Sequence, residues 1–141
     1  MMIYPKVFLL ADDDPEDQEM LEEAMLEADP AIKMHMANNG QQAVEYLESC
    51  ADNELPCFII LDYKMPVFNA VEVLERIRVQ PRLKAIPKVV WSTSNQPEHV
   101  RSCLEKGALE YFVKPSQVGE LSNIVDRVLF LCEKALEKRR Q

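Results

Sequence analysis

The sequence predicts an α/β fold in which a five-stranded parallel sheet carries helices on both faces. Short apolar runs alternate with amphipathic stretches five times along the chain. The apolar runs are continuous, as in strands buried on both faces, and do not alternate with polar residues. The loops between them are short, which favours sequential strand–helix units with parallel strands.

The first half of the chain contains two of these units. Residues 6–11 (KVFLLA) are a continuous apolar run and predict a strand. Residues 15–28 repeat apolar side chains at helical spacing, and Asp14 before a proline is a favourable N-cap. A second strand is expected over 32–36, followed by a helix over about 40–49.

The second half contains the other three units. Residues 57–61 (CFIIL) are the most apolar run, so this strand is expected at the centre of the sheet. Gly107 suits the C′ position that ends a helix. The remaining expected elements are helices over 70–79, 97–106 and about 118 to beyond 136, and strands over 88–91 and 110–113.

Length and composition limit the possible functions. A chain of 141 residues fits one domain, expected over 1–141 with a core of about 6–136. A formal net charge of −8 argues against nucleic-acid binding, which needs clustered Lys and Arg. No apolar run is long enough to cross a membrane, and no signal peptide is recognisable, so a cytoplasmic location is expected. The four cysteines lack zinc-ligand spacing and are expected to be reduced core residues.

Polar side chains follow four of the expected strands. Asp12 and Asp13 come after the first strand, Asp62 after the third, Ser92 after the fourth and Lys114 after the fifth. In an open parallel sheet, ligands bind beyond the carboxyl ends of the strands. Several carboxylates in one pocket need a counter-charge, and Mg²⁺ with oxygen ligands supplies it. A carboxylate in such a site can act as a nucleophile towards phosphorus.

Four short motifs then resemble those of response-regulator receiver domains of the CheY-like type. They are LLADDD (9–14), IILDYKMP (59–66), VVWSTS (89–94) and YFVKP (111–115), one at each of four strand ends and in the family's order. The resemblance covers about residues 6–136. It implies a doubly wound, flavodoxin-like sheet with strand order 2-1-3-4-5, in a receiver domain of the stand-alone type.

The resemblance also implies roles for individual residues. Asp62 would accept a phosphoryl group. Asp13, Asp62 and the backbone carbonyl of Lys64 would bind Mg²⁺ directly, and Asp12 would bind it through a water molecule. The phosphodonor would be a sensor histidine kinase or a histidine phosphotransfer protein, and the signal would pass to a downstream protein target.

On the side of the phosphoryl group, the resemblance implies that Ser92 hydrogen-bonds it and Lys114 pairs with it. The Lys114–Pro115 peptide bond would be cis. Tyr111 would be an aromatic switch residue, whose ring changes exposure when the Ser92 hydroxyl moves. The face formed by the fourth helix, fifth strand and fifth helix would be the output surface.

The sequence departs from the family in the loop after Asp62. Val67 and Ala70 stand where glycines are frequent, which predicts a stiffer loop whose backbone does not easily take positive φ. Lys64 and Ser94 occupy positions that tune dephosphorylation in the family. We therefore expect an altered lifetime of the aspartyl-phosphate, without a predicted direction.

Several of these residues also have purely structural interpretations. The Asp12–Asp14 run could cap a helix, and Ser92 and Thr93 could simply end a strand. Tyr111 could be a packing aromatic. His35 and His99 are expected to be ordinary strand or surface residues.

The last expected helix adds one possible interface residue. Phe130 falls outside the apolar arc of that helix, so it is either a half-covered surface aromatic or a contact for a partner or second copy. The arc itself is wide for a helix that covers only one sheet face. Its width favours a homodimer.

The sequence thus favours a phosphorylatable signalling switch, with at most slow autodephosphorylation as enzyme activity. One alternative is a pseudo-receiver, a binding module that keeps the fold without phosphorylation. Another is a Mg²⁺-dependent phosphohydrolase, but the DYKMP run lacks the second aspartate that would act as general acid–base. Three glycines cannot build a glycine-rich phosphate loop, which argues against a nucleotide-binding protein.

Overall fold

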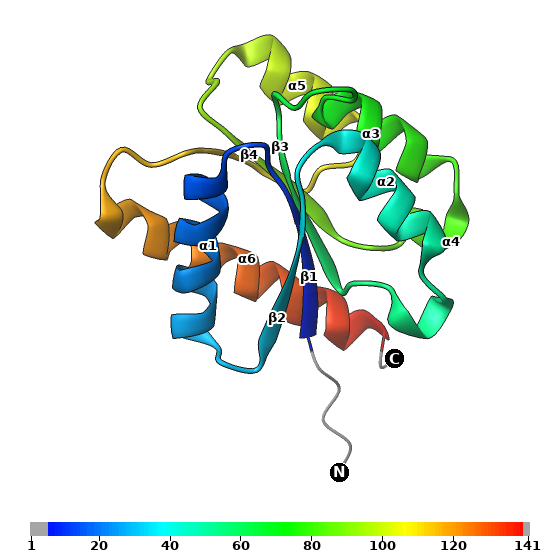
Figure 1. Ribbon diagram of the computed structural model, residues 1–141, viewed down its shortest axis with the longest axis horizontal. Coiled ribbons are helices and arrows are strands. Elements are labelled where there is room, and N and C mark those ends of the chain that lie inside the picture. The colour runs from blue at the N-terminus through cyan, green and yellow to red at the C-terminus, as the bar shows by residue number, and fades with distance from the viewer. Residues whose placement is uncertain (1–5, 140–141) are drawn as a thin grey trace.

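The computed structural model describes residues 6–139 and contains one five-stranded parallel sheet (Figure 1). The strands lie in the order β2-β1-β3-β4-β5, with β3 at the centre as its apolar sequence predicted. Their bounds are β1 Lys6–Ala11, β2 Ile32–Ala37, β3 Phe58–Asp62, β4 Lys88–Ser92 and β5 Tyr111–Val113.

Helices cover both faces of this sheet, as Figure 1 shows. On one face lie α1 (Pro15–Ala28) and α6 (Val118–Arg139), and on the other lie α2 (Gly40–Ser49), α3 (Ala70–Arg78) and α5 (Pro97–Glu105). Two apolar clusters fill the two interfaces, so every residue of β3 is buried. Among residues 6–139, no helix combines the length and apolarity needed to span a bilayer.

The helices begin and end where local chemistry predicts. The Asp14 side chain accepts a hydrogen bond from the Glu16 backbone N–H and caps α1. Asn69 caps α3 and exchanges hydrogen bonds with Glu72 in a capping box. Gly107 has φ +116° just after α5, a left-handed conformation that suits glycine.

Two short helical segments were not predicted. A 3₁₀ turn, η1, spans Asp52–Glu54, and α4 spans Pro81–Lys84 with Leu83 fully buried. A single turn gives no periodic signal, and α4 is held by packing of one leucine into the core. The strands β3 and β4 also extend one residue further than predicted, to Asp62 and Ser92. Asp62 therefore pairs with Trp91 inside the sheet, which orients its side chain.

Gly40, the first residue of α2, lies against the loop that follows β3. A Cβ atom at this position would lie 2.2 Å from the Phe68 carbonyl oxygen. We expect Gly40→Ala to cost about 1–3 kcal/mol of unfolding free energy, because backbone atoms must move apart. Denaturant unfolding measures the loss. Gly119→Ala in the first turn of α6 is the matched control, since nothing lies near its Cβ, and it should not destabilise.

Lys88 is a buried lysine at the amino end of β4. Its side chain is 5% exposed, and its ammonium donates a hydrogen bond to the Lys84 carbonyl oxygen at 3.0 Å. Burial, followed by the nearby charge of Lys84, lowers the Lys88 pKa to about 8. Below that pH the Lys88 ammonium is charged while buried in the folded protein. Its burial lowers the stability of the folded state, because the same ammonium is solvated in the unfolded chain.

Lys88→Met should therefore raise the unfolding free energy at pH 7 by about 1–3 kcal/mol. The gain should shrink as the pH rises from about 8 towards 10.5, because wild-type Lys88 is then already neutral in the folded state. Denaturation curves across this range measure it. A gain that is independent of pH would contradict the electrostatic cause. Lys33→Met, at an exposed lysine of β2, serves as control.

Candidate phosphoacceptor and metal site

A cleft of about 440 Å³ lies at the carboxyl ends of the strands. It is lined by Asp13, Asp14, Pro15, Asp17, Asp62, Lys64, Thr93 and Lys114. These residues follow β1, β3, β4 and β5 or lie in the first turn of α1. The predicted convergence of strand ends thus occurs, because parallel strands deliver their carboxyl ends to one edge.

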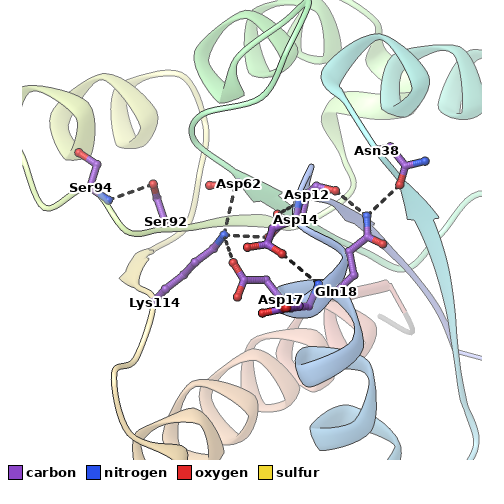
Figure 2. A network of polar contacts seen from close by, with 10 residues as sticks. Asp12, Asp14, Asp17, Gln18, Asn38, Asp62, Ser92, Ser94 and Lys114 are labelled. Carbon is purple, nitrogen blue, oxygen red and sulfur yellow. Dashed lines mark hydrogen bonds and ion pairs between the residues drawn. The ribbon is translucent and has the colours of Figure 1, made fainter.

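Lys114 is the centre of the polar network in this cleft (Figure 2). Its Nζ lies 3.0 Å from Asp12, 2.8 Å from Asp17 and 3.2 Å from Asp62. The side chain is only 8% exposed. Burial alone would lower the Lys114 pKa, but hydrogen bonds to Asp17 and Asp12 and the charge of Asp62 raise it, so the ammonium stays charged.

Asp12 and Asp62 are buried carboxylates that repel each other. Burial, followed by the charge of Asp12, raises the Asp62 pKa to about 6, although Lys114 opposes the shift. Burial also raises the Asp12 pKa. The cleft therefore holds more negative charge than Lys114 alone compensates.

Hydrogen bonds from helix α1 hold Asp12 in place. Its Oδ1 accepts from the Asp14 backbone N–H at 2.9 Å, and its carbonyl oxygen accepts from the Gln18 side-chain amide. Gln18 also donates to the Asn38 side chain after β2, as Figure 2 shows. The ends of β1 and β2 are thus joined through one glutamine.

The residues present fit a divalent cation. Asp12, Asp13 and Asp62 each place a carboxylate oxygen within 4.8 Å of the others. Among the described residues, the Lys114 ammonium, 3.0 Å away, is the one cation paired with the buried Asp12 Oδ2. An all-oxygen set with surplus negative charge is what Mg²⁺ or a similar hard cation takes.

Ser92, the last residue of β4, is buried and is not among the residues that line the cleft, whereas its neighbour Thr93 lines it. The buried Ser92 Oγ accepts a hydrogen bond from the Ser94 backbone N–H at 3.2 Å. The Tyr111 hydroxyl donates to the Ser94 carbonyl oxygen at 2.8 Å. The half-buried Tyr111 ring is therefore tied to the same loop as the Ser92 hydroxyl, while its role as a switch stays a prediction.

The sequence interpretation missed three residues at this site. Asp17 pairs with Lys114, and Thr93 is exposed and lines the cleft. His99 stacks on Tyr63 with ring centroids 4.0 Å apart, and its Nδ1 lies 2.6 Å from the Ser94 Oγ. No spacing in the sequence signals these contacts, except that Asp17 lies one helical turn after the capping residue.

The predicted cis bond before Pro115 is wrong for this structure. No peptide bond among residues 6–139 is cis, so Lys114 joins Pro115 in trans. The trans form of an X–Pro bond is intrinsically favoured by about 0.5–1 kcal/mol, and only surrounding contacts can reverse that preference.

The prediction that the loop after Asp62 avoids positive φ is also wrong. Val67 has φ +71°, and the Phe68 N–H donates to the Pro66 carbonyl oxygen at 2.9 Å. This pattern is the strained γ-turn. It brings Phe68 against Gly40 of α2, so the tertiary contact and the turn hydrogen bond override the local preference of valine.

Val67→Gly should relieve this strain and raise the unfolding free energy by up to about 1 kcal/mol. A left-handed conformation costs a residue with a Cβ about 1–2 kcal/mol, and the greater freedom of glycine in the unfolded chain offsets part of the gain. Thermal unfolding compares the variants. Val79→Gly, at an exposed valine with φ −84°, should instead destabilise the protein.

Phe130 lies outside the core on α6, with 49% of its surface exposed. The Arg127 guanidinium and the Lys134 ammonium lie 5.1 and 5.6 Å from its ring centroid. These cation–π contacts cover part of the ring without a partner protein. Its use as an interface, and a homodimer, stay predictions.

A five-stranded parallel α/β sheet with an acidic cluster and a buried lysine at its carboxyl edge is the arrangement of a receiver-type fold. The family model for the response regulator receiver domain matches residues 8–126, and the chain belongs to that family.

Known proteins agree with this assignment. The two-component response regulator ORR11 of Oryza sativa subsp. indica is 34% identical over 98 residues, which span 70% of this chain and 65% of that protein. The phosphorylated cyanobacterial phytochrome response regulator RcpA aligns with a TM-score of 0.80 and 26% identity, over 89% of this chain and 91% of its own. The receiver domain of the sensor histidine kinase PA1611 from Pseudomonas aeruginosa PAO1, with magnesium coordinated in its active-site cleft, aligns with a TM-score of 0.68 and 26% identity. That alignment spans 89% of this chain and 98% of the receiver domain.

Proposed function

We propose that this receiver domain accepts a phosphoryl group on Asp62 from a partner histidine kinase or histidine phosphotransfer protein. The observation that carries the proposal is the buried Lys114 ammonium, which lies 3.2 Å from Asp62 and also pairs with Asp12. A cation held beside a buried carboxylate is placed to bind the oxygens of a group transferred to that carboxylate.

In this proposal Asp13, Asp62 and the Lys64 carbonyl oxygen bind Mg²⁺ directly, and Asp12 binds it through water. The bound ion would neutralise the carboxylates and the incoming phosphoryl oxygens. The fit of the acidic cluster and the magnesium in the PA1611 receiver domain support this assignment. Lys64 is exposed at the cleft, so its backbone can face a ligand there.

The transfer step itself uses Asp62 as nucleophile. One Asp62 carboxylate oxygen forms a bond to phosphorus while the bond from phosphorus to the donor imidazole nitrogen breaks. With a pKa of about 6, the Asp62 carboxyl is mostly ionised at pH 7 and ready to attack. Lys114 and the Ser92 hydroxyl then hold the phosphoryl oxygens. A shift of Ser92 would pass through Ser94 to Tyr111 and the surface of β5 and α6, where a downstream protein would read it.

The domain acts in this proposal as a switch rather than as an enzyme. The phosphohydrolase alternative lacks a second carboxylate two residues after Asp62, where Lys64 stands. The pseudo-receiver alternative is disfavoured because the acidic cluster, Ser92 at the end of β4 and Lys114 after β5 are all present at the carboxyl edge of the sheet.

Incubation with acetyl phosphate and Mg²⁺, followed by intact-mass measurement, tests the proposal. We expect one added phosphoryl group on the wild type and none on Asp62→Asn. No addition to the wild type would support the pseudo-receiver, and addition that persists in Asp62→Asn would place the acceptor elsewhere. The decay of the adduct after donor removal, compared with Lys64→Ala, tests the expected effect of Lys64 on lifetime.

Trp91 offers a second measurement. It is the only tryptophan in the chain, and the Lys114 ammonium lies 4.9 Å from its ring centroid. Titration with Mg²⁺ should change the Trp91 fluorescence as Lys114 adjusts to the new charge. The Asp13→Asn variant should weaken this response, whereas Asp126→Asn on the exposed side of α6 should leave it unchanged.

A further inference from the structure

Cys57 and Cys132 are far apart in the sequence and adjacent in the structure. Cys57 directly precedes β3, and Cys132 lies within α6. Their Sγ atoms are 3.8 Å apart, within reach of a weak S–H···S hydrogen bond. The pair lies near the amino end of β3, at the opposite edge of the sheet from Asp62, so it belongs to no part of the phosphoacceptor site.

The backbone that carries each cysteine is fixed by hydrogen bonding or by packing. The Cys57 N–H donates to the Val7 carbonyl oxygen at 2.8 Å, next to the strand pairing of β1 and β3. Cys132 is 1% exposed in the cluster that fixes α6 to the sheet. A disulfide needs an S–S distance of about 2.05 Å, so side-chain rotation must bring the sulfurs together by roughly 1.8 Å.

The two thiols differ in accessibility and in acidity. Cys57 is half-buried, whereas Cys132 is buried. A hydrogen bond from the Cys132 thiol, opposed by burial, lowers the Cys57 pKa, and the charges of Arg139 and Lys6 act in the same direction. The same contact raises the Cys132 pKa. Cys57 is thus the sulfur that reacts first with an external oxidant, and Cys132 is placed to resolve the product.

We propose that Cys57 and Cys132 form a reversible, peroxide-responsive disulfide that joins α6 covalently to the start of β3. The Cys57 thiolate attacks hydrogen peroxide, which breaks the O–O bond and gives a sulfenic acid and hydroxide. The Cys132 sulfur then attacks the Cys57 sulfur and releases hydroxide, while the Cys132 proton passes to solvent. The sum is two thiols and one peroxide converted to one disulfide and two waters.

This modification would fix α6 covalently to the start of β3, on the sheet face that α6 covers. The chain between Cys57 and Cys132 is long, so closing it restricts the unfolded state strongly. The oxidised domain should therefore melt at a higher temperature than the reduced domain, and a dithiol should reverse the difference. The inference does not depend on phosphorylation of Asp62.

Controlled oxidation of the full chain with hydrogen peroxide tests the proposal. We expect the four free thiols to fall to two, with a mass loss of two hydrogen atoms and no dimer on a non-reducing gel. Peptide mapping should join the peptides that contain Cys57 and Cys132. A disulfide through Cys50 or Cys103, or oxidation of Cys57 to sulfinic acid without a disulfide, would overturn the assignment.

Four variants separate the roles of the sulfurs. Cys57→Ser should leave Cys132 unreacted, whereas Cys132→Ser should stop Cys57 at a sulfenic acid that dimedone traps. Cys50→Ser and Cys103→Ser are the matched controls and should form the bond like the wild type. If Cys132→Ser does not fold, Cys132→Ala gives the same readout, and the wild-type peptide map decides the pairing without any variant.

Discussion

The Asp62→Asn variant should be more stable than the wild type in metal-free buffer at pH 7, by about 1–3 kcal/mol. Burial and the charge of Asp12 raise the Asp62 pKa to about 6 in the folded protein, above its ordinary value of 3.8. The folded state therefore favours the protonated form, and the ionised form destabilises it at pH 7. Asparagine keeps the shape and removes that charge.

The pH dependence of this gain has a defined sign. Between about pH 4 and 6 the folded wild type binds more protons than the unfolded chain, so its stability falls as the pH rises through this window. The advantage of Asp62→Asn should accordingly vanish near pH 4. Denaturant unfolding in the presence of a chelator measures it. Added Mg²⁺ should stabilise the wild type more than the variant, and an unchanged difference with Mg²⁺ would argue against Asp62 as a metal ligand.

The Lys114→Met variant should have the opposite and larger effect, a loss of about 3–5 kcal/mol at pH 7 without metal. It leaves Asp12, Asp17 and Asp62 facing one another without the ammonium that now lies within 3.2 Å of each. The buried carboxylates can then be accommodated only by taking up protons. The loss should therefore be smaller at acidic pH, where protonation relieves the repulsion.

Mg²⁺ should restore part of the stability of Lys114→Met, because a divalent cation supplies the missing counter-charge. The measurement is the midpoint of thermal unfolding with Mg²⁺ and with chelator, compared between variant and wild type. Lys134→Met on α6 is the control, since Lys134 is exposed and its ammonium pairs with Glu137 and lies near the Phe130 ring. If Mg²⁺ raised the unfolding midpoint of the wild type and of Lys114→Met equally, Lys114 would not be coupled to the metal site.

The predictable part of the site follows from chain order and strand direction. Asp12, Asp62, Ser92 and Lys114 each end a recognisable apolar run, so a parallel sheet must bring them to one edge. The structure places Lys114 against Asp12 and Asp62 accordingly. The resemblance of the motifs was needed for their separate roles, and one role it implied, the cis bond before Pro115, is absent.

The unpredicted contacts join segments that are far apart in the sequence, and no local sequence pattern indicates that these segments meet. Val67 adopts positive φ because Phe68 packs against Gly40, in a different strand–helix unit. The stacking of His99 on Tyr63 likewise needs the first turn of α5 to lie beside the loop after β3. Valine alone favours the opposite backbone conformation, and a lone histidine carries no positional signal.

The sequence by itself determined the layered α/β fold, the central place of β3 and the edge of the sheet where carboxylates, hydroxyl and ammonium meet. Periodicity and strand polarity are local properties, and they suffice for those conclusions. Only the tertiary structure decided that Lys114 also pairs with Asp17, that Val67 is strained and that Cys57 touches Cys132. Each of these contacts depends on how the helices and loops pack over the sheet, because a shift of a few ångströms decides whether two side chains touch.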